Sequence, residues 1–394
     1  MTAIASDGAG VGAARKVVRY LEQRRREMLG TLQALVELES PSLDKTAVDR
    51  LGEFLAQEFT RLGGKVKVHR QANSGNHLEA SFPAERRGRG GKPVLLLGHM
   101  DTVYEVGTLK SMPFRVAQGR AWGPGTFDMK SGIAQMLFAL RALRQVLGGL
   151  GRPVTVLLVS DEEIGSPTSR RITEALARKA QAVLVLEPAH GPGGALKTSR
   201  KGVGDYVVKV TGRAAHAGLD FRAGQSAILE LAQQIAVIQK FTDLERGLTV
   251  NVGLVRGGTR TNVVAAEAVA EVDVRIARLG DAALVEEKFR SLRSFNPKCK
   301  LEVSGGINRP PLERSQGGAL LYGVAKGLAR GLGWKLDEAA VGGGSDGNFT
   351  AALGVPTLDG LGGVGDGAHA PHESVLLAEL PRRAALLAGL VETV

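Results

Sequence analysis

The chain has one cysteine, few aromatic residues and no long apolar run. Cys299 is alone and cannot form an internal disulfide, and residues 1–16 lack the apolar core of a signal peptide. Both observations favour a cytoplasmic location. No apolar run approaches the length of a membrane span, so no membrane association is expected. The aromatic share is only 4%, but 43% hydrophobic and 23% charged residues are ordinary for a folded globular chain.

Acidic residues are scarce relative to basic ones. The 40 Asp and Glu residues face 51 Lys and Arg residues, which gives a formal net charge of +11. The basic residues are scattered, with only short clusters at 24–26 and 86–89, so we expect no nucleic-acid partner. Either an anionic small substrate or a solvated basic surface accounts for the charge.

The length of 394 residues favours two domains over a single hydrophobic core. Strand-like and helical segments alternate between residues 46 and 186, a pattern typical of an α/β domain with a mostly parallel sheet. Residues 201–308 instead follow the order β-α-β-β-α-β, which predicts a ferredoxin-like α/β sandwich. We therefore expect a discontinuous domain, 1–200 and 309–394, that carries this sandwich as an insert.

Hydrophobic periodicity gives the expected bounds of the elements. In the discontinuous domain the expected helices are 14–38, 46–63, 129–147, 168–179, 315–331 and 378–392, and the expected strands are 65–69, 78–82, 94–98, 154–159 and 182–186. In the insert they are strands 206–212, 248–258, 267–275 and 299–304 and helices 224–241 and 281–294.

Three of the expected strands run directly into residues that can bind metals. The carboxyl ends of parallel strands meet at one edge of a sheet, so these residues should converge. A single His-x-Asp motif is commonly only a capped turn, and adjacent glutamates are usually solvated. Several carboxylates gathered at one edge, however, repel one another unless cations neutralise them. The residues are His99 and Asp101 after 94–98, Asp161, Glu162 and Glu163 after 154–159, and Glu187 after 182–186.

Two further segments contribute the same chemistry. GPGTFDMKSG (123–132) holds Asp128 between glycines, and GDGAHAPHES (365–374) holds His369 and His372. Imidazoles and carboxylates without thiolates suit a catalytic zinc site, with cobalt or manganese as substitutes. Two metals suit these ligands better than one, because one carboxylate can bridge a pair about 3.5–4 Å apart. Of two adjacent glutamates, one would then bind metal and the other would accept a proton from the metal-bound water.

Taken together, these segments resemble the M20 family of zinc metallopeptidases, and most of all its glutamate carboxypeptidase (carboxypeptidase G2) branch. A lone His-x-Asp would be a weak signal, whereas an ordered series along most of the chain is specific. The matching segments are LLLGHMDTVY, GPGTFDMKSG, SDEEIGSPTSR, VLEPA, GRAAHAG, TNVV, VDVR, GGGSDGNF and HAPHE.

The resemblance implies two zinc ions per subunit and different roles for Glu162 and Glu163. It makes Glu162 the general base and later the acid, and it makes Asp101 the residue that orients a ligand histidine. Asp161 is expected to be structural, either as part of the turn or as a residue that supports the ligands from behind. His372 remains a rival to His369, although only His369 has the His-x3-Glu spacing to Glu373. The implied ligands are His99 and Glu187 on one zinc, Glu163 and His369 on the other, and Asp128 bridging both.

The resemblance also implies that the insert is a lid domain through which two subunits form a homodimer. His216 of GRAAHAG would reach the partner's site and stabilise the oxyanion, with Asn262 and Arg275 near the substrate. Arg309, in NRPP at the return to the first domain, is a candidate for pairing with a substrate carboxylate. A structural role at the hinge is equally open for Arg309.

The sequence thus predicts a di-zinc hydrolase that cleaves the amide of an N-acyl or peptidyl amino acid by Glu162-assisted attack of a metal-bridging water. The released C-terminal amino acid would be one such as glutamate. An N-acetyl-amino-acid deacylase or a dipeptidase would use the same site. A non-catalytic metal- or anion-binding protein is the alternative of another class, but it would not need Glu162 beside the five ligands.

Overall fold

The computed structural model describes residues 8–86 and 91–394, and contacts divide the chain into two compact units. The first comprises the chain as far as Ser199 with Arg314–Ala340 and Ser345–Val394, and the second comprises Arg200–Glu313 and Val341–Gly344. Relative to the expected insert, 201–308, the second unit begins one residue earlier, extends five residues further and includes a glycine segment. The Arg200 guanidinium explains this inclusion, because it donates to the carbonyls of Gly343 and Gly344.

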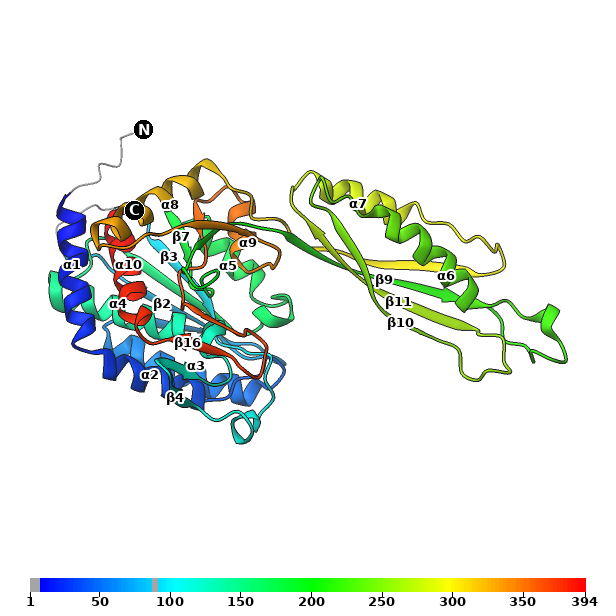
Figure 1. Ribbon diagram of the computed structural model, residues 1–394, viewed down its shortest axis with the longest axis horizontal. Helices are drawn as coiled ribbons and strands as arrows, with labels where there is room; N and C mark the ends of the chain where they lie inside the picture. The colour runs from blue at the N-terminus through cyan, green and yellow to red at the C-terminus, as the bar shows by residue number, and fades with distance from the viewer. Residues whose placement is uncertain (1–7, 87–90) are drawn as a thin grey trace. The chain divides into compact units, whose positions relative to one another are not determined.

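Helices and strands alternate along much of the first unit (Figure 1). Its helices are α1 (Gly8–Glu22), α2 (Arg25–Glu37), α3 (Lys45–Arg61), α4 (Ser131–Leu147), α5 (Arg170–Ala177), α8 (Gln316–Gly331), α9 (Gly347–Ala352) and α10 (Glu379–Thr393). Its strands are β1 (Lys65–His69), β2 (His77–Phe82), β3 (Val94–His99), β4 (Arg115–Ala117), β5 (Arg120–Trp122), β6 (Val154–Val159), β7 (Ala182–Val185), β14 (Thr357–Leu358), β15 (Gly365–Asp366) and β16 (Ser374–Leu376). Two more strands, β8 (Leu196–Arg200) and β13 (Glu338–Val341), pair with each other. Among the described residues, no helix is both long enough and apolar enough to cross a membrane.

The main sheet has the strand order β1-β2-β6-β3-β7-β14. Strands β6, β3, β7 and β14 are parallel, whereas β2 pairs antiparallel with β6 and β1 pairs antiparallel with β2. The predicted α/β class with a mostly parallel sheet is therefore confirmed, with an antiparallel addition at one edge. Because β3, β6 and β7 are adjacent and parallel, the residues that follow them leave the sheet at the same edge.

Side chains of the central strands alternate between two hydrophobic cores. In β3, Val94 and Leu96 belong to the core beneath α3 and α4, while Leu95 and Leu97 belong to the core beneath α5. Burial of both faces explains why these strands read as unbroken apolar runs.

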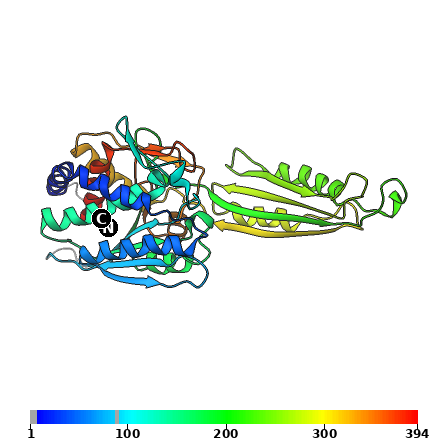
Figure 2. The same cartoon turned by 90° about the horizontal axis from the view of Figure 1, so that it is seen from below.

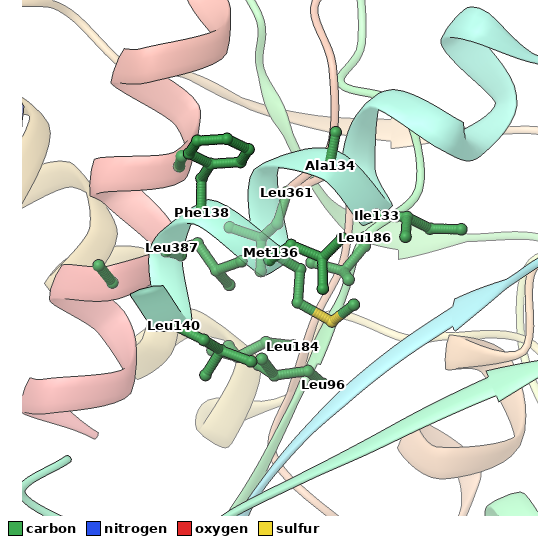
Figure 3. Packing of buried hydrophobic residues seen from close by; sticks show 14 of the residues in the cluster. Leu96, Ile133, Ala134, Met136, Phe138, Leu140, Leu184, Leu186, Leu361 and Leu387 are labelled. Carbon is green, nitrogen blue, oxygen red and sulfur yellow. The ribbon is translucent and has the colours of Figure 1, made fainter. Parts of the chain in front are cut away.

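Helix α4 is mostly buried and lies between the sheet and α10 (Figure 3). Its Met136 and Leu140 are directed toward Leu96 of β3 and Leu184 of β7, and Leu387 of α10 lies on its other side. The N-terminus of α4 is thereby fixed against the sheet, directly after the loop that carries Asp128.

The expected helix 14–38 is wrong as a single element, because the chain breaks at Gln23 and Arg24 into α1 and α2. Helix α1 packs mainly on α10 and also on α4 and α8, whereas α2 packs on α4 and on the loop that carries Asp128.

A small sheet of order β15-β16-β5-β4 was not predicted. Its strands have only two or three residues and therefore show no periodicity, and its pairing joins distant positions such as Trp122 and Ser374. This sheet brings the segment that carries His369 beside the loop that carries Asp128.

The second unit is the predicted β-α-β-β-α-β sandwich, with all-antiparallel strand order β10-β11-β9-β12. Figures 1 and 2 show its two helices on one face of the sheet, and Tyr206 stacks on Phe289 beneath them with ring centroids 3.9 Å apart. The elements are β9 (Gly202–Thr211), α6 (Ala227–Ile238), β10 (Thr249–Gly257), β11 (Glu267–Ile276), α7 (Asp281–Arg290) and β12 (Lys300–Arg309).

Candidate metal and active site

The residues that follow β3, β6 and β7 converge as predicted. His99 ends β3, and its Nε2 lies 3.4 Å from Oε1 of Glu187, which follows β7. Two overlapping groups of donor atoms each lie within 4.8 Å of one another, His99 with Asp128 and Glu163, and His99 with Glu162 and Glu187. Donors from three strand ends and one loop therefore meet at one edge of the sheet.

Asp128 lies between two imidazoles and presents a different oxygen to each. Its Oδ1 is 3.1 Å from Nε2 of His99, and its Oδ2 is 3.5 Å from Nε2 of His369. The same Nε2 of His369 is 3.1 Å from Oε1 of Glu163. Burial alone would raise the pKa of Asp128, but hydrogen bonds from both imidazoles hold that pKa far below its usual range. A carboxylate in this position can join two neighbouring cation sites.

The carboxylates also change how the two imidazoles titrate in the protein without metal. Burial would lower the pKa of His99, yet hydrogen bonds from its ring to the carboxylates of Asp128 and Glu187 raise that pKa well above its usual value. Hydrogen bonds from its ring to the carboxylates of Asp128 and Glu163 raise the pKa of His369 to about 10. In the protein without metal, both rings are therefore positively charged at neutral pH. A metal ion would have to replace the additional proton of each ring.

His369, rather than its rival, is the histidine that reaches the carboxylates. No carboxylate of the described residues lies within ion-pair distance of His372, whereas His369 pairs with Glu163 and Asp128. The Glu of the expected His-x3-Glu spacing is Glu373, and its carboxylate holds the loop that carries Asp128.

Asp101 holds the Glu162–Glu163 turn with its carboxylate. Its Oδ2 accepts hydrogen bonds from Oγ of Ser42 at 2.7 Å and from N of Glu163 at 3.1 Å, and its Oδ1 accepts from N of Glu162 at 3.3 Å. His99 Nδ1 lies 2.9 Å from the main-chain oxygen of Asp101 and 3.6 Å from its carboxylate. Burial raises the pKa of Asp101 to about 6. Asp101 thus orients His99 through its main chain and the two glutamates through its side chain.

Asp161 serves the turn, as predicted. Its Oδ2 accepts hydrogen bonds from N and Oγ1 of Thr168, both at 2.7 Å, and from N of Ser169 at 3.2 Å. These contacts order the segment between the glutamates and α5. Asp161, the first of the three consecutive acids, is therefore a local structural residue.

Glu373 is a residue of the site for which the sequence predicted no role. It is fully buried, its Oε1 accepts from N of Phe127 at 2.7 Å and N of Asp128 at 2.9 Å, and its Oε2 accepts from N of Gly125 at 3.0 Å. The glycine-bounded loop turns three backbone amides to one side, and such amides need an acceptor when buried. The need of these amides for an acceptor, together with the presence of Glu373 near His369 in the sequence, was the signal from which this role of Glu373 could have been predicted.

In the second unit, His216 and Asn262 lie side by side. His216 forms an isolated bridge with Val263, and N of Ala217 donates to the carbonyl of Asn262 at 2.9 Å. The Nδ1 of His216 accepts from N of Gly218 at 3.1 Å, which leaves the proton of the neutral ring on Nε2. This tautomer is a hydrogen-bond donor at its outer nitrogen.

Arg275 and Arg309 lie at the opposite end of the same sheet. Both are paired in register with Val203, one from β11 and one from β12, whereas His216 follows Thr211 at the far end of β9. Strand rise makes the separation between Val203 and Thr211 about 26 Å. The four substrate-binding candidates of this unit therefore form two separate groups. Arg275 also makes a bidentate pair with Asp273 in its own strand.

The composition of the site fits divalent cations. Four carboxylates face two imidazoles, so negative charge remains in excess even when both rings are protonated. Oxygen and imidazole nitrogen donors are those that zinc and similar metals take in catalytic sites. The four acids are Asp128, Glu162, Glu163 and Glu187.

A mostly parallel α/β sheet that gathers such donors at the carboxyl ends of its strands defines an α/β protein with a candidate metal site. Within that class the chain belongs to peptidase family M20/M25/M40, whose family model matches residues 95–393. It is 32% identical over 391 residues to carboxypeptidase G2 of Pseudomonas sp. (strain RS-16), covering 97% of this chain and 94% of that protein. The protein is therefore an M20 metallocarboxypeptidase-family enzyme.

Solved structures of the family share the fold. One is an M20 family metallo-carboxypeptidase, Sso-CP2 from Sulfolobus solfataricus, with a TM-score of 0.74, 17% identity and coverage of 93% of this chain and 98% of that chain. Another is YXEP of Bacillus subtilis, described as a dinuclear metal-binding peptidase, with a TM-score of 0.67, 16% identity and coverage of 94% and 98%.

Proposed function

We propose that this enzyme is a di-zinc hydrolase that cleaves the amide bond of N-acyl or peptidyl amino acids and releases the C-terminal amino acid, with glutamate as the first candidate. The observation that carries the proposal is the position of Asp128, which presents one carboxylate oxygen to His99 and the other to His369. The similarity to carboxypeptidase G2 and the dinuclear site named for YXEP support the same reading.

In this proposal His99 and Glu187 would hold one metal, Glu163 and His369 would hold the other, and Asp128 would serve both. When bound, the metals act as Lewis acids that polarise the scissile carbonyl. The buried side chains of Asp101 and Glu373 keep the segments that carry these donors in place.

Glu162 carries the proton in this mechanism. Its carboxylate accepts a proton from the attacking water as the new carbon–oxygen bond forms, and it returns that proton to the amine nitrogen as the carbon–nitrogen bond breaks. The main-chain N–H of Glu162, bonded to Asp101, keeps the carboxylate beside His99 and Glu187. The outer Nε2–H of His216 donates to the developing oxyanion, and Arg309 and Arg275 bind the carboxylate of the substrate.

The spacing inside the second unit supports a homodimer. One N-acyl amino acid is too short to touch both His216 and the arginines of the same chain, since Val203 beside the arginines and Thr211 before His216 are about 26 Å apart, so each site would take the two groups from different chains. The edge strand β10 exposes Leu254 and Val255, and Leu229 of α6 is also exposed, which suits a surface for a second copy.

Mixing two inactive variants should restore activity if His216 acts in the partner's site. His216→Ala lacks the oxyanion donor and Glu162→Ala lacks the base, but a mixed dimer has one site with both residues. After subunit exchange of equal amounts, we expect about a quarter of the wild-type rate from statistical pairing. Absence of recovery, although mass spectrometry detects mixed dimers, would place His216 in its own chain's site.

Metal binding should release protons and weaken as the pH falls. The raised pKa values of His99 and His369 mean that both rings are protonated near pH 7 without metal, and only neutral rings are ligands. Lower pH therefore favours the metal-free form. Calorimetry at pH 7 in two buffers of different ionisation enthalpy should give about two protons released per chain.

Two variants control this experiment. His372→Ala should leave the number of released protons unchanged, whereas His369→Ala should reduce it by about one. The opposite pattern would make His372 the ligand.

Release of amino acid from a panel of N-acyl amino acids and dipeptides tests the proposed function directly. The metal-loaded enzyme should release the C-terminal amino acid, the chelator-treated enzyme should not, and added zinc should restore the rate. A panel hydrolysed equally well after complete metal removal would contradict the proposal.

A further inference from the structure

One buried histidine has no part in the proposed mechanism. Of the seven histidines only His77 and His99 are buried, and His77, the first residue of β2, has no solvent-exposed surface. Strand β2 pairs antiparallel with β6, and the ring of His77 lies beside the end of β6. Only Ser160 and Asp161 separate the end of β6 from Glu162.

Both ring nitrogens of His77 have a partner in the segment that follows β6. Nδ1 accepts a hydrogen bond from N of Ser160 at 3.2 Å, and Nε2 lies 2.9 Å from Oγ1 of Thr168. Oγ of Ser160 lies 3.0 Å from the same Nδ1 and also donates to the carbonyl of Gly75. The hydroxyl proton of Thr168 is already used, because Oγ1 donates to Oδ2 of Asp161 at 2.7 Å. Nε2 is therefore the donor to Thr168, and the ring is neutral with its proton on Nε2.

A single ring thus joins the two ends of the segment 160–168. Glu162 and Glu163 lie inside this segment, and their N–H groups are held by Asp101. Asp101 therefore fixes the turn itself, whereas His77 fixes the two ends between which the turn lies.

A second proton on the ring would break this link. The protonated Nδ1 would face the N–H of Ser160, which would then lose its acceptor. Burial lowers the pKa of His77 below its usual value, the charge of Asp161 acts in the opposite direction, and two basic neighbours lower the pKa further. The ring therefore gains its second proton only as the solution becomes acidic. The titratable groups that face it are Asp161 after β6, His69 of β1 and Lys45 at the start of α3.

We propose that His77 is a positioning residue: its neutral ring closes the segment 160–168 and keeps the carboxylate of Glu162 in position for proton transfer. This inference rests on the proposed function, in which Glu162 is the base. His77 touches neither substrate nor metal in that mechanism, so its loss should slow proton transfer and leave substrate binding almost unchanged. A displacement of about 1 Å in a catalytic site can cost up to about 100-fold in rate.

Two variants each keep one of the two hydrogen bonds. His77→Asn has an amide oxygen near the position of Nδ1 that can accept from Ser160, but it does not reach Thr168. His77→Gln has an amide nitrogen near the position of Nε2 that can donate to Thr168, but it leaves N of Ser160 without this acceptor. Each should lower kcat by about tenfold, with KM within about twofold of the wild-type value and an unchanged metal content. His69→Gln is the matched control and should keep the wild-type kcat, because His69 lies in the neighbouring strand β1 and pairs with Glu79 instead.

Imidazole ¹⁵N NMR of the zinc-loaded enzyme adds a readout that a general loss of stability would not give. The signals of His77 are those missing from His77→Gln, and at neutral pH they should show a proton on Nε2 and none on Nδ1. The wild-type kcat should also fall more steeply on acidification than that of His77→Gln. Both Glu162 and His77 gain a proton in the wild type, whereas only Glu162 does so in the variant.

A ring of His77 that is charged at neutral pH, or that carries its proton on Nδ1, would overturn the proposal. Values of kcat within about twofold of the wild type in both variants, or an equal loss in His69→Gln, would overturn it as well. The hydrolase would stand after any of these results, because the wild-type enzyme would still release amino acid. No metal-dependent release by the wild-type enzyme would instead overturn the proposed function and the role of His77 together.

Discussion

Glu162→Gln should lower kcat by about a thousandfold and leave the metal content of the enzyme unchanged. Glutamine has nearly the same shape as glutamate but accepts no proton at neutral pH, so the attacking water loses its base. The main-chain N–H of residue 162 still bonds to Asp101 in the variant, so the turn itself should be retained.

Metal analysis and steady-state kinetics on the same preparation check this prediction. The measurement also decides between two roles, because an oxygen of Glu162 lies in the same donor group as His99 and Glu187. Loss of one metal from Glu162→Gln would make Glu162 a ligand, and a near-normal rate would remove it from proton transfer. Glu53→Gln, on the exposed face of α3, is the control and should retain full activity.

Glu373→Gln should weaken metal binding by about 10- to 100-fold, although Glu373 is not an expected ligand. Both oxygens of Glu373 accept hydrogen bonds from the loop that carries Asp128, and an amide NH2 at either position would face a backbone donor. One or two buried N–H groups would then lack an acceptor, and the loop would move to find one. Asp128 would move with it, and Asp128 is the carboxylate proposed to hold both metals.

Competition with a chelating dye gives the affinity, and thermal unfolding of the metal-free protein separates this effect from a general loss of stability. We expect the free energy of unfolding to fall by about 1–3 kcal/mol, the usual range for a buried group left without its partner. Glu39→Gln is the matched control, because Glu39 also accepts two backbone hydrogen bonds, from Gly107 and Leu109, but on a loop without an expected ligand. Wild-type metal affinity in Glu373→Gln would contradict this prediction, because the Asp128 loop would then keep its position without the acceptor oxygens of Glu373.

Long, regular elements were predictable because their local pattern reports their burial. β3, β6 and β7 are covered on both faces, so each is a nearly continuous apolar run, and the polar residues at their ends stand out. The order β-α-β-β-α-β of the second unit was also predictable, since each strand and each helix shows the hydrophobic periodicity of its type.

Short elements and register were not predictable. The two- and three-residue strands of the small sheet exist only because partners such as Trp122 and Ser374 pair. The sequence around each residue does not predict that pairing. The separation of His216 from Arg275 and Arg309 likewise follows from strand register, which depends on contacts between distant residues.

By itself, then, the sequence determined the kinds of donor groups, the strands that carry them and the family to which they belong. Only the tertiary structure decided which donors meet: that His369 rather than His372 faces Glu163, that Asp128 stands between two imidazoles, and that Glu373 holds the loop of Asp128. The reason is physical. Residue types and periodicity are local properties, whereas contacts between residues more than 200 positions apart exist only after the sheets have paired and the cores have packed.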